Sequence, residues 1–186
     1  MRTFPLSRRF HMNHYSSNIR EAVLEDAAEI TEVHVQSWKE SYKGIVEQDY
    51  LDCISFAERL KQRKNILSGH SDKGKNLIVF NHRNQIIGFC DIGIARDERF
   101  MGCGEIYAIY ILKGYQREGI GTALWKQSVN YFKTRNLIPF YVLVLEQNWS
   151  ARMFYEKHRG TIAHVEAITL GNHSYKEICY CFKECV

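Results

Sequence analysis

Residues 105–122 read EIYAIYILKGYQREGIGT, and this stretch decides the fold. Its first eight residues are β-branched, aromatic or otherwise apolar except for Glu105, which predicts a strand. A turn follows at Lys113 and Gly114. From Ile120 onward the apolar residues recur at helical spacing, so the sequence predicts a strand, a loop with spaced glycines and the beginning of a helix.

The loop between the predicted strand and helix has the features of an anion-binding site. The unpaired N–H groups and the partial positive charge of a helix N-terminus favour an anion. Gly119 and Gly121 would let the backbone approach that anion closely, and Arg117 adds a cation beside it. An ordinary tight turn between a strand and a helix is the alternative interpretation.

Two other nucleotide-binding motifs do not fit this loop. A P-loop requires four residues between its glycines and a following Gly-Lys-Ser/Thr, and the loop has neither. A dinucleotide-binding loop begins with a glycine directly after the strand and has a third glycine at the position of Leu124. The spacing therefore excludes both motifs.

The loop does match the pattern Gln/Arg-x-x-Gly-x-Gly/Ala, which is filled by Gln116, Arg117, Gly119 and Gly121. It resembles the acetyl-CoA loop of the GNAT superfamily of N-acetyltransferases. A second block, residues 140–160, reads FYVLVLEQNWSARMFYEKHRG and resembles the next strand and helix of that superfamily. The residues in register there are Asn148, Ala151, Phe154, Tyr155 and Gly160. The resemblance covers residues 18–183, and its specific part is 105–160.

The resemblance implies an α/β (α+β) fold with one acetyltransferase domain, residues 18–186, after a flexible leader at residues 1–17. The central sheet would be mixed but mostly antiparallel, with about six or seven strands and helices on both faces. Strands 105–112 and 140–145, joined by a helix, would be parallel neighbours that splay apart.

Local patterns predict the remaining elements. Asp26 is expected to cap a first helix, on whose inner face His34 is interpreted as a core histidine. A second helix is expected from about Ser55 to Leu67, and Asn148 is expected to cap a helix that begins at Trp149. The further strands are expected at 18–23, 77–80, 85–94, 161–170 and 174–183.

Composition narrows the class of protein. A chain of 186 residues that is 45% hydrophobic can bury one sizeable core. The formal charge of +4 comes without a dense Lys/Arg run, and no apolar stretch approaches 18 residues, so neither nucleic-acid nor membrane partners are expected. The spacing of Cys179, Cys181 and Cys185 lacks the C-x-x-C knuckle of a metal site. No metal is expected, and the cysteines are interpreted as reduced thiols of a cytoplasmic protein.

Acetyl transfer from a thioester to an amine requires a neutral amine, a stabilised oxyanion and a proton donor for the leaving thiolate. By resemblance, Tyr155 lies where the superfamily has its thiolate acid, and a phenol pKa near 10 suits that role. Core packing is the alternative for Tyr155. Glu105 is the candidate base, directly or through water, because a carboxylate on an apolar strand is costly without a purpose. A salt bridge at the strand end is its alternative role.

The resemblance also implies how acetyl-CoA is held. The pyrophosphate would meet the N–H groups of residues 117–122, and the pantetheine arm would pair with Asn148 and with the backbone of Ile109 and Ile111. The expected cofactor-binding residues are Ile109, Tyr110, Ile111, Gln116, Arg117, Glu118, Gly119, Ile120, Gly121, Thr122 and Asn148.

The acceptor side is less defined. Trp38 and Tyr42 would line the acceptor pocket by resemblance, or they simply pair four residues apart on a helix. The expected acceptor is a small-molecule amine, a peptide N-terminus or a lysine, and the protein is a possible homodimer. A non-catalytic acyl-CoA-binding or regulatory module on the same fold is the alternative function.

Overall fold

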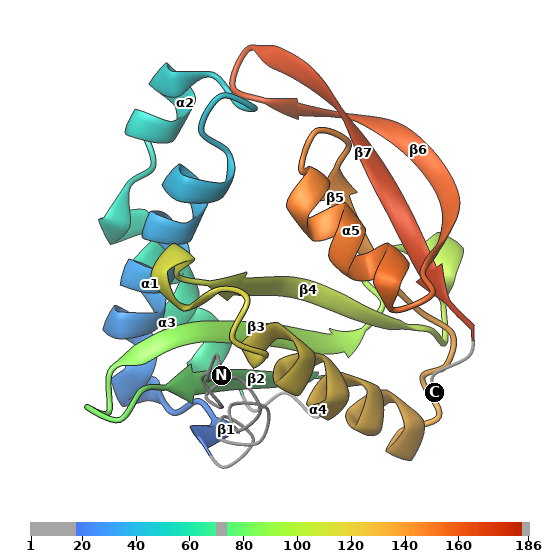
Figure 1. The fold of residues 1–186 in the computed structure, drawn as a ribbon, viewed down its shortest axis with the longest axis horizontal. Helices are drawn as coiled ribbons and strands as arrows, with labels where there is room; N and C mark the ends of the chain where they lie inside the picture. Colours follow the sequence, from blue (N-terminus) through green and yellow to red (C-terminus); the bar gives the residue numbers. More distant parts are fainter. Residues whose placement is uncertain (1–17, 70–73, 184–186) are drawn as a thin grey trace, which may run out of the picture.

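The structure is a computed structural model that describes residues 18–69 and 74–183; the expected leader at 1–17 lies outside them. Seven strands form one sheet in the order β1-β2-β3-β4-β5-β7-β6 (Figure 1). The strands are β1 Ile19–Glu21, β2 Gly74–Phe80, β3 Ile86–Ile94, β4 Gly104–Ile111, β5 Phe140–Leu145, β6 Thr161–Leu170 and β7 His173–Phe182. Only β4 and β5 are parallel, so the expected mixed, mostly antiparallel sheet is confirmed.

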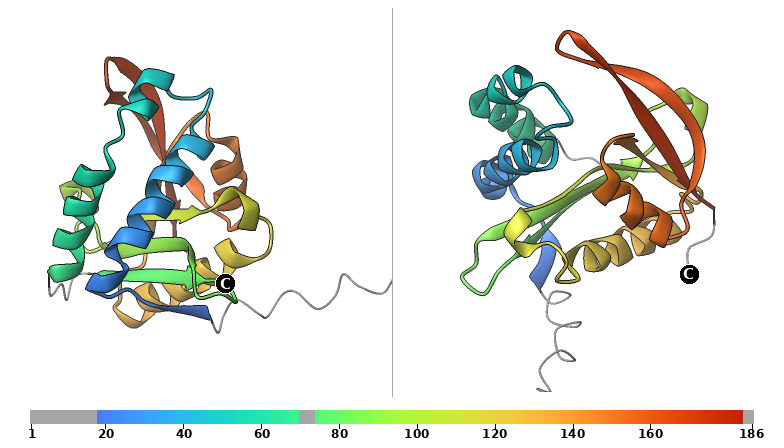
Figure 2. Two further views of the ribbon diagram at one scale, coloured as in Figure 1. Left: turned by 90° about the vertical axis from the view of Figure 1, so that its left-hand side faces the viewer. Right: turned by 45° about the horizontal axis from the view of Figure 1, so that its top comes forward.

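Helices cover both faces of the sheet, as expected (Figure 2). One face carries α1, α2 and α3; α4 and α5 pack on the other, where the largest apolar core lies. The helices are α1 Ala27–Ser41, α2 Gln48–Asp52, α3 Phe56–Ser68, α4 Ile120–Thr134 and α5 Trp149–Lys157.

The predicted N-caps of these helices have different outcomes. Ser55 accepts a hydrogen bond from the Glu58 N–H, and Asn148 accepts one from the Ala151 N–H, as expected for N-caps. Asp26 is the N-cap residue of α1, as expected, but within the described residues its side chain makes no capping hydrogen bond to that helix. Its carboxylate instead accepts hydrogen bonds from Arg20 and from the Val23 N–H, because β1 brings a guanidinium within 2.6 Å of it.

The parallel pair of strands is closed at one end and open at the other. Gly104–Ile106 pair with Phe140–Val142, and the pairing stops there. Beyond that point β5 turns away from β4 together with the β6–β7 hairpin (Figure 1). The expected splay is confirmed, and it leaves one edge of β4 unpaired over residues 107–111.

The hairpin is tied to α2 across the open end of the sheet. The Tyr175 hydroxyl accepts a hydrogen bond from the Glu47 N–H at 3.1 Å, and Tyr50 packs against Gly171 in the hairpin turn. Leu145, Tyr42 and Leu51 share a small buried core there. The fold therefore places the end of α1, α2 and the hairpin around the gap between β4 and β5.

Candidate active site

The loop from β4 to α4 has the backbone geometry of an anion cradle. Arg117 and Gly119 both have positive φ, +66° and +89°, and Gly119 is the N-cap residue of α4. No side chain caps the helix, and a Cβ built on Gly119 would meet no atom within 4 Å. The first-turn N–H groups of α4 thus meet open space at Gly119, which fits a phosphate group.

The unpaired edge of β4 lies next to this cradle. The Gln116 side chain, at the start of the loop, donates a hydrogen bond to the Ile111 carbonyl at 2.9 Å. Ile109 and Ile111 pack toward α4 and α5, whereas Tyr110 packs toward α1 and α3. The edge and the cradle are therefore continuous, and a peptide-like arm can pair with one while its phosphates meet the other.

Tyr155 reaches the open end from α5. It is 4% exposed and packs among Trp125, Phe154 and Tyr180. Burial raises the pKa of its hydroxyl far above the usual value, and Tyr42 raises it further. The expected phenol pKa near 10 is therefore wrong for this residue, and its hydroxyl is protonated at every working pH.

Three tyrosine hydroxyls from different elements interact at the open end. Burial raises the pKa of Tyr110 well above its usual value, and the neighbouring Tyr42 and Tyr155 add to that shift. Burial also raises the pKa of Tyr42, whose hydroxyl interacts with Tyr110 and with Asn148. Asn148 thus caps α5 and lies beside Tyr42, which places both predicted residues at one site.

Trp38 and Tyr42 fit both interpretations of their spacing. Their rings lie 4.7 Å apart on α1, so they do pair on the helix. They also pack against Tyr50 and Tyr110 above the open end of β4. The Trp38 Nε1 is buried without a hydrogen-bond partner in good geometry. An acceptor-binding role for this pair stays a prediction.

Glu105 lies at the closed end of the β4–β5 pair and is 2% exposed. Its carboxylate accepts hydrogen bonds from the Arg96 N–H at 2.9 Å, from the Arg96 guanidinium and from the Tyr141 hydroxyl at 3.0 Å. The pKa of Arg96 is raised by this contact. The ion pair at the strand end is therefore present, and a base role for Glu105 stays a prediction.

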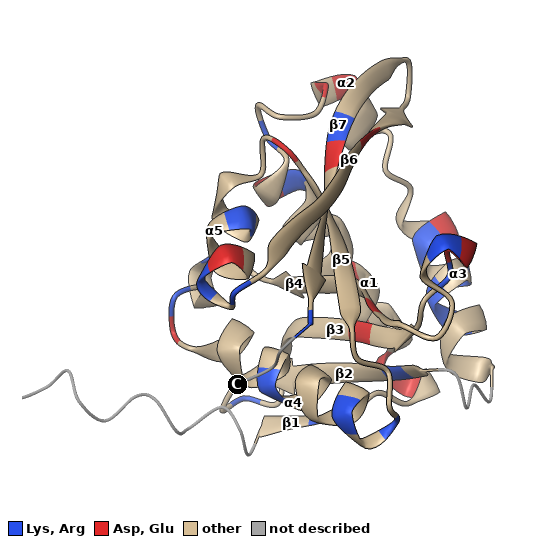
Figure 3. Ribbon diagram, turned by 90° about the vertical axis from the view of Figure 1, so that its right-hand side faces the viewer, with Lys and Arg blue, Asp and Glu red and all other residues tan. Residues whose placement is uncertain are grey.

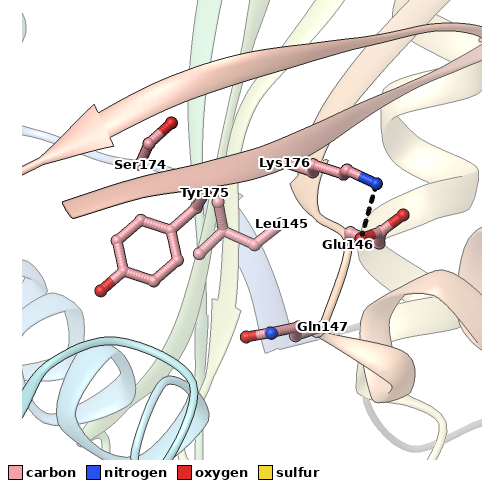
Figure 4. A pocket seen from close by; sticks show the side chains of 6 residues that line it. All are labelled: Leu145, Glu146, Gln147, Ser174, Tyr175 and Lys176. Atoms are coloured by element: carbon pink, nitrogen blue, oxygen red, sulfur yellow. Dashed lines mark ion pairs between the residues drawn. The ribbon is translucent and has the colours of Figure 1, made fainter.

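A cavity of about 230 Å³ opens between the end of β5 and β7. Figure 4 shows the side chains of Leu145, Gln147 and Tyr175 in its lining, and the ion pair of Lys176 with Glu146 at 3.9 Å. Leu145 and Tyr175 of this lining pack with Tyr42 and Leu51. Within the described residues, the cavity shares no lining residue with the loop of Gly119.

Sequence reasoning missed one carboxylate here, Glu177 of β7. It lies in register with Leu145, the last residue of β5, and it is half-buried. Glu177 directly precedes the buried residues Ile178, Cys179 and Tyr180. The signal that singled out Glu105, a carboxylate on an apolar strand, was therefore present at Glu177 as well.

Comparison with known proteins agrees with this geometry. Residues 30–161 match the model of the acetyltransferase (GNAT) family, and the chain belongs to that family. It is 34% identical to the uncharacterized N-acetyltransferase YuaI of Bacillus subtilis over 75% of this chain and 78% of that protein. It is 25% identical to the spermidine N(1)-acetyltransferase of Thermoplasma acidophilum over 77% of this chain and 87% of that protein.

A solved structure has the same fold. It is PaiA N-acetyltransferase from Thermoplasma acidophilum in complex with coenzyme A, which aligns with a TM-score of 0.65 at 21% identity over 86% of this chain and 96% of that one. With the family match and the curated relatives, the protein is an acetyl-CoA-dependent N-acetyltransferase. No helix within residues 18–69 and 74–183 is long and apolar enough to cross a membrane.

Proposed function

We propose that this N-acetyltransferase moves the acetyl group of acetyl-CoA directly onto a primary amine bound on the α1–α2 side of the open end. The observation that carries the proposal is that two open spaces lie next to the point where β4 and β5 separate. The cradle of Gly119 and the edge of β4 lie on one side, and the polar cavity beside Leu145 lies on the other.

On the donor side, the N–H groups of residues 117–122 and the Arg117 side chain would hold the pyrophosphate. Ile109, Ile111 and Asn148 would pair with the pantetheine arm. Acetyl-CoA supplies an activated thioester carbonyl. The buried Tyr155 hydroxyl, always protonated, would donate a hydrogen bond and then a proton to the departing sulfur.

On the acceptor side, the charges favour a cationic amine. Carboxylates lie in the cavity and at its rim: Glu146 lines it and pairs with Lys176, Glu47 contacts its Tyr175, and Glu177 lies opposite its Leu145. A protonated amine is attracted to such a rim, which also raises its local concentration. Spermidine is the first acceptor to test, because a relative of this chain is named as its acetyltransferase.

The surface charges and the free thiols bear on nucleic-acid binding and on the location of the protein. Lys and Arg alternate with Asp and Glu on the face in Figure 3, which does not favour nucleic acid. The five cysteines within the described residues are free thiols, which fits a cytoplasmic location. Light scattering of the purified protein tests whether it forms the expected homodimer.

The test of the function is a panel of amines. Thiol release from acetyl-CoA is measured with spermidine, with a peptide that has a free N-terminus and with an N-blocked lysine peptide. We expect turnover that depends on both substrates, with spermidine fastest. Acetyl-CoA binding without turnover of any amine would favour the non-catalytic module instead.

A further inference from the structure

The amine must lose a proton before it attacks, and two carboxylates along the splayed strands could take it, Glu105 at the closed end and Glu177 beside the open end. The two differ in their partners. Both oxygens of Glu105 are occupied by donors from Arg96 and Tyr141. These donors direct the Glu105 carboxylate toward Arg96 and Tyr141 and not toward a ligand at the open end.

Glu177 has the opposite surroundings. Within the part of the chain that the structure describes, its carboxylate has no hydrogen bond or ion pair. Residues directly opposite each other in an antiparallel pair project to the same face, so Glu177 shares the face of Leu145. Leu145 packs against Tyr42 and Leu51, whereas the next residue, Ile178, packs into the core on the α4 and α5 side. Glu177 therefore faces the acceptor side.

Glu177 also lies close to the groups expected to act. The charge of Glu177 raises the pKa of Tyr42, and Tyr42 in turn raises the pKa of Tyr155. Tyr42 thus interacts with both the carboxylate on β7 and the phenol on α5. An amine between these two groups would have a base on one side and a proton donor on the other.

We propose that Glu177 is the carboxylate that binds the acceptor's ammonium group and takes its proton, while Glu105 holds the closed end of the sheet. This inference rests on the proposed function. It names a primary ammonium ion as the species bound, since an unpaired carboxylate selects a cation.

The Glu177 carboxylate takes one proton from the ammonium, and the freed lone pair forms the N–C bond. As the C–S bond breaks, the sulfur takes the Tyr155 proton, and Tyr155 regains one from the nitrogen. Glu177 then releases its proton to water. The sum is ammonium plus thioester giving acetamide, thiol and one proton.

The groups around Glu177 support this role. Its pKa is raised first by burial, then by Glu166 across the hairpin and by Glu105 on β4, while Arg96 on the loop before β4 lowers it. Tyr42 from α1 and Cys179 from β7 are its other titratable neighbours. A raised pKa brings a carboxylate closer to the range in which a general base is efficient.

The test is the pH dependence of kcat/KM for Glu177→Gln, with the amine of the panel that the wild type acetylates fastest. The wild type should be flat from neutral pH toward the amine pKa, about 10.4 for an alkylamine. The variant can use only free amine, so its log kcat/KM should rise with a slope of about one per pH unit over the same range. At pH 7 the loss should be roughly 10²-fold or more.

Two controls separate this role from a structural one. Glu166→Gln, its neighbour across the hairpin, should change kcat/KM by less than about threefold, as expected for an exposed charge paired with Arg99. Glu177→Gln should keep the melting temperature and the acetyl-CoA affinity of the wild type. If Glu177→Gln does not fold, Glu177→Asp should still fold and keep the flat profile at a reduced rate.

A binding measurement completes the test without turnover. Calorimetry of spermidine into CoA-saturated protein should show at least about tenfold weaker binding for Glu177→Gln. An active wild type with parallel pH profiles and equal spermidine binding in the variant would overturn the Glu177 assignment alone. A wild type that acetylates no amine would overturn the proposed function itself.

Discussion

Glu105 at the closed end of the β4–β5 pair and Glu177 of β7 beside its open end are both glutamates, but their surroundings are opposite. At the closed end Glu105 is buried and receives hydrogen bonds from Arg96 and Tyr141. At the open end Glu177 is half-buried, and burial and like charges raise its pKa. Within the described residues Glu105 is held by hydrogen-bond donors and Glu177 is not, and this difference in partners separates a structural carboxylate from a chemical one.

The largest effect that tests this contrast belongs to the proton donor at the open end. Tyr155→Phe keeps the ring and its packing against Trp125 but removes the hydroxyl. The turnover rate should fall by roughly 10²- to 10⁴-fold, while acetyl-CoA binding and melting stay unchanged. Because burial keeps the phenol protonated, the wild-type rate should show no alkaline decline from Tyr155 below pH 10. A rate within twofold of wild type would assign the donor role to water or to another residue.

The next effect concerns the cradle. Gly119→Val places a β-branched residue at φ +89° and puts its methyl groups into the open space at the α4 N-terminus. Acetyl-CoA should bind roughly 100-fold more weakly, about 2.7 kcal/mol, as measured by calorimetry.

Gly102→Val is the matched control for the cradle. Gly102 has φ +82° and equally open surroundings, but it lies in the loop before β4. Both variants should lose a similar stability, about 1–2 kcal/mol from the left-handed conformation. Equal acetyl-CoA affinities in the two variants would show that the cradle is not at Gly119.

The third effect separates the two carboxylates directly. Glu105→Gln leaves Arg96 and Tyr141 with an amide in place of a carboxylate, so the cost should appear in stability. We expect a loss of about 2 kcal/mol, because the carboxylate is buried although Arg96 is largely exposed. The melting temperature should fall by roughly 4–8 °C.

The kinetic signature of Glu105→Gln should differ from that of Glu177→Gln. With Glu105 in a structural role, the pH profile of kcat/KM keeps the wild-type shape at a uniformly lower level. A selective loss at neutral pH that shrinks at high pH would instead restore Glu105 as the base and contradict the division between the two ends.

The contrast also shows what the sequence could and could not predict. The strand–glycine loop–helix unit and the cap at Asn148 depend on residues close together in the chain, and the local patterns predicted them. The splay of β4 and β5 was predicted from the family resemblance. The partners of Glu105 are not close to it in the chain, and no local pattern predicted them. Arg96 lies on a loop and Tyr141 on another strand, so only the sheet register brings them together.

The errors have the same physical origin. Asp26 has a good capping residue type, but Arg20 from β1 competes for its carboxylate at 2.6 Å. Tyr155 has a phenol of ordinary pKa in isolation, and three-dimensional burial raises it. Glu177 has the same local signal as Glu105, a carboxylate on an apolar strand, but only the sheet register shows that Leu145 is its neighbour across β5 and β7.

The smallest effect probes the wall above the open end, where His34 of α1 packs against Phe89 and Tyr110 at 5.5 and 5.3 Å between ring centroids. Burial, with Arg59 and Arg63 nearby, lowers the pKa of His34 to about 3. The unfolded chain, with a pKa near 6.5, therefore binds more protons between these two values. The stability that depends on neutral His34 is complete above pH 6.5 and is lost as the pH falls toward 3.

Melting curves at pH 7.5 and 5.5 measure this loss. For the wild type, His34 should account for about 1 kcal/mol of the decrease, or roughly 2–4 °C, and His34→Gln should remove that part. His158→Gln is the control: its pKa is also lowered by burial, but it stacks on Trp125 behind α5. Of the two histidines, His34 packs against Tyr110 and His158 does not. Acidification should therefore raise the acceptor KM in the wild type and in His158→Gln, but not in His34→Gln. An equal rise of the acceptor KM in all three proteins would show that charging His34 does not disturb the open end.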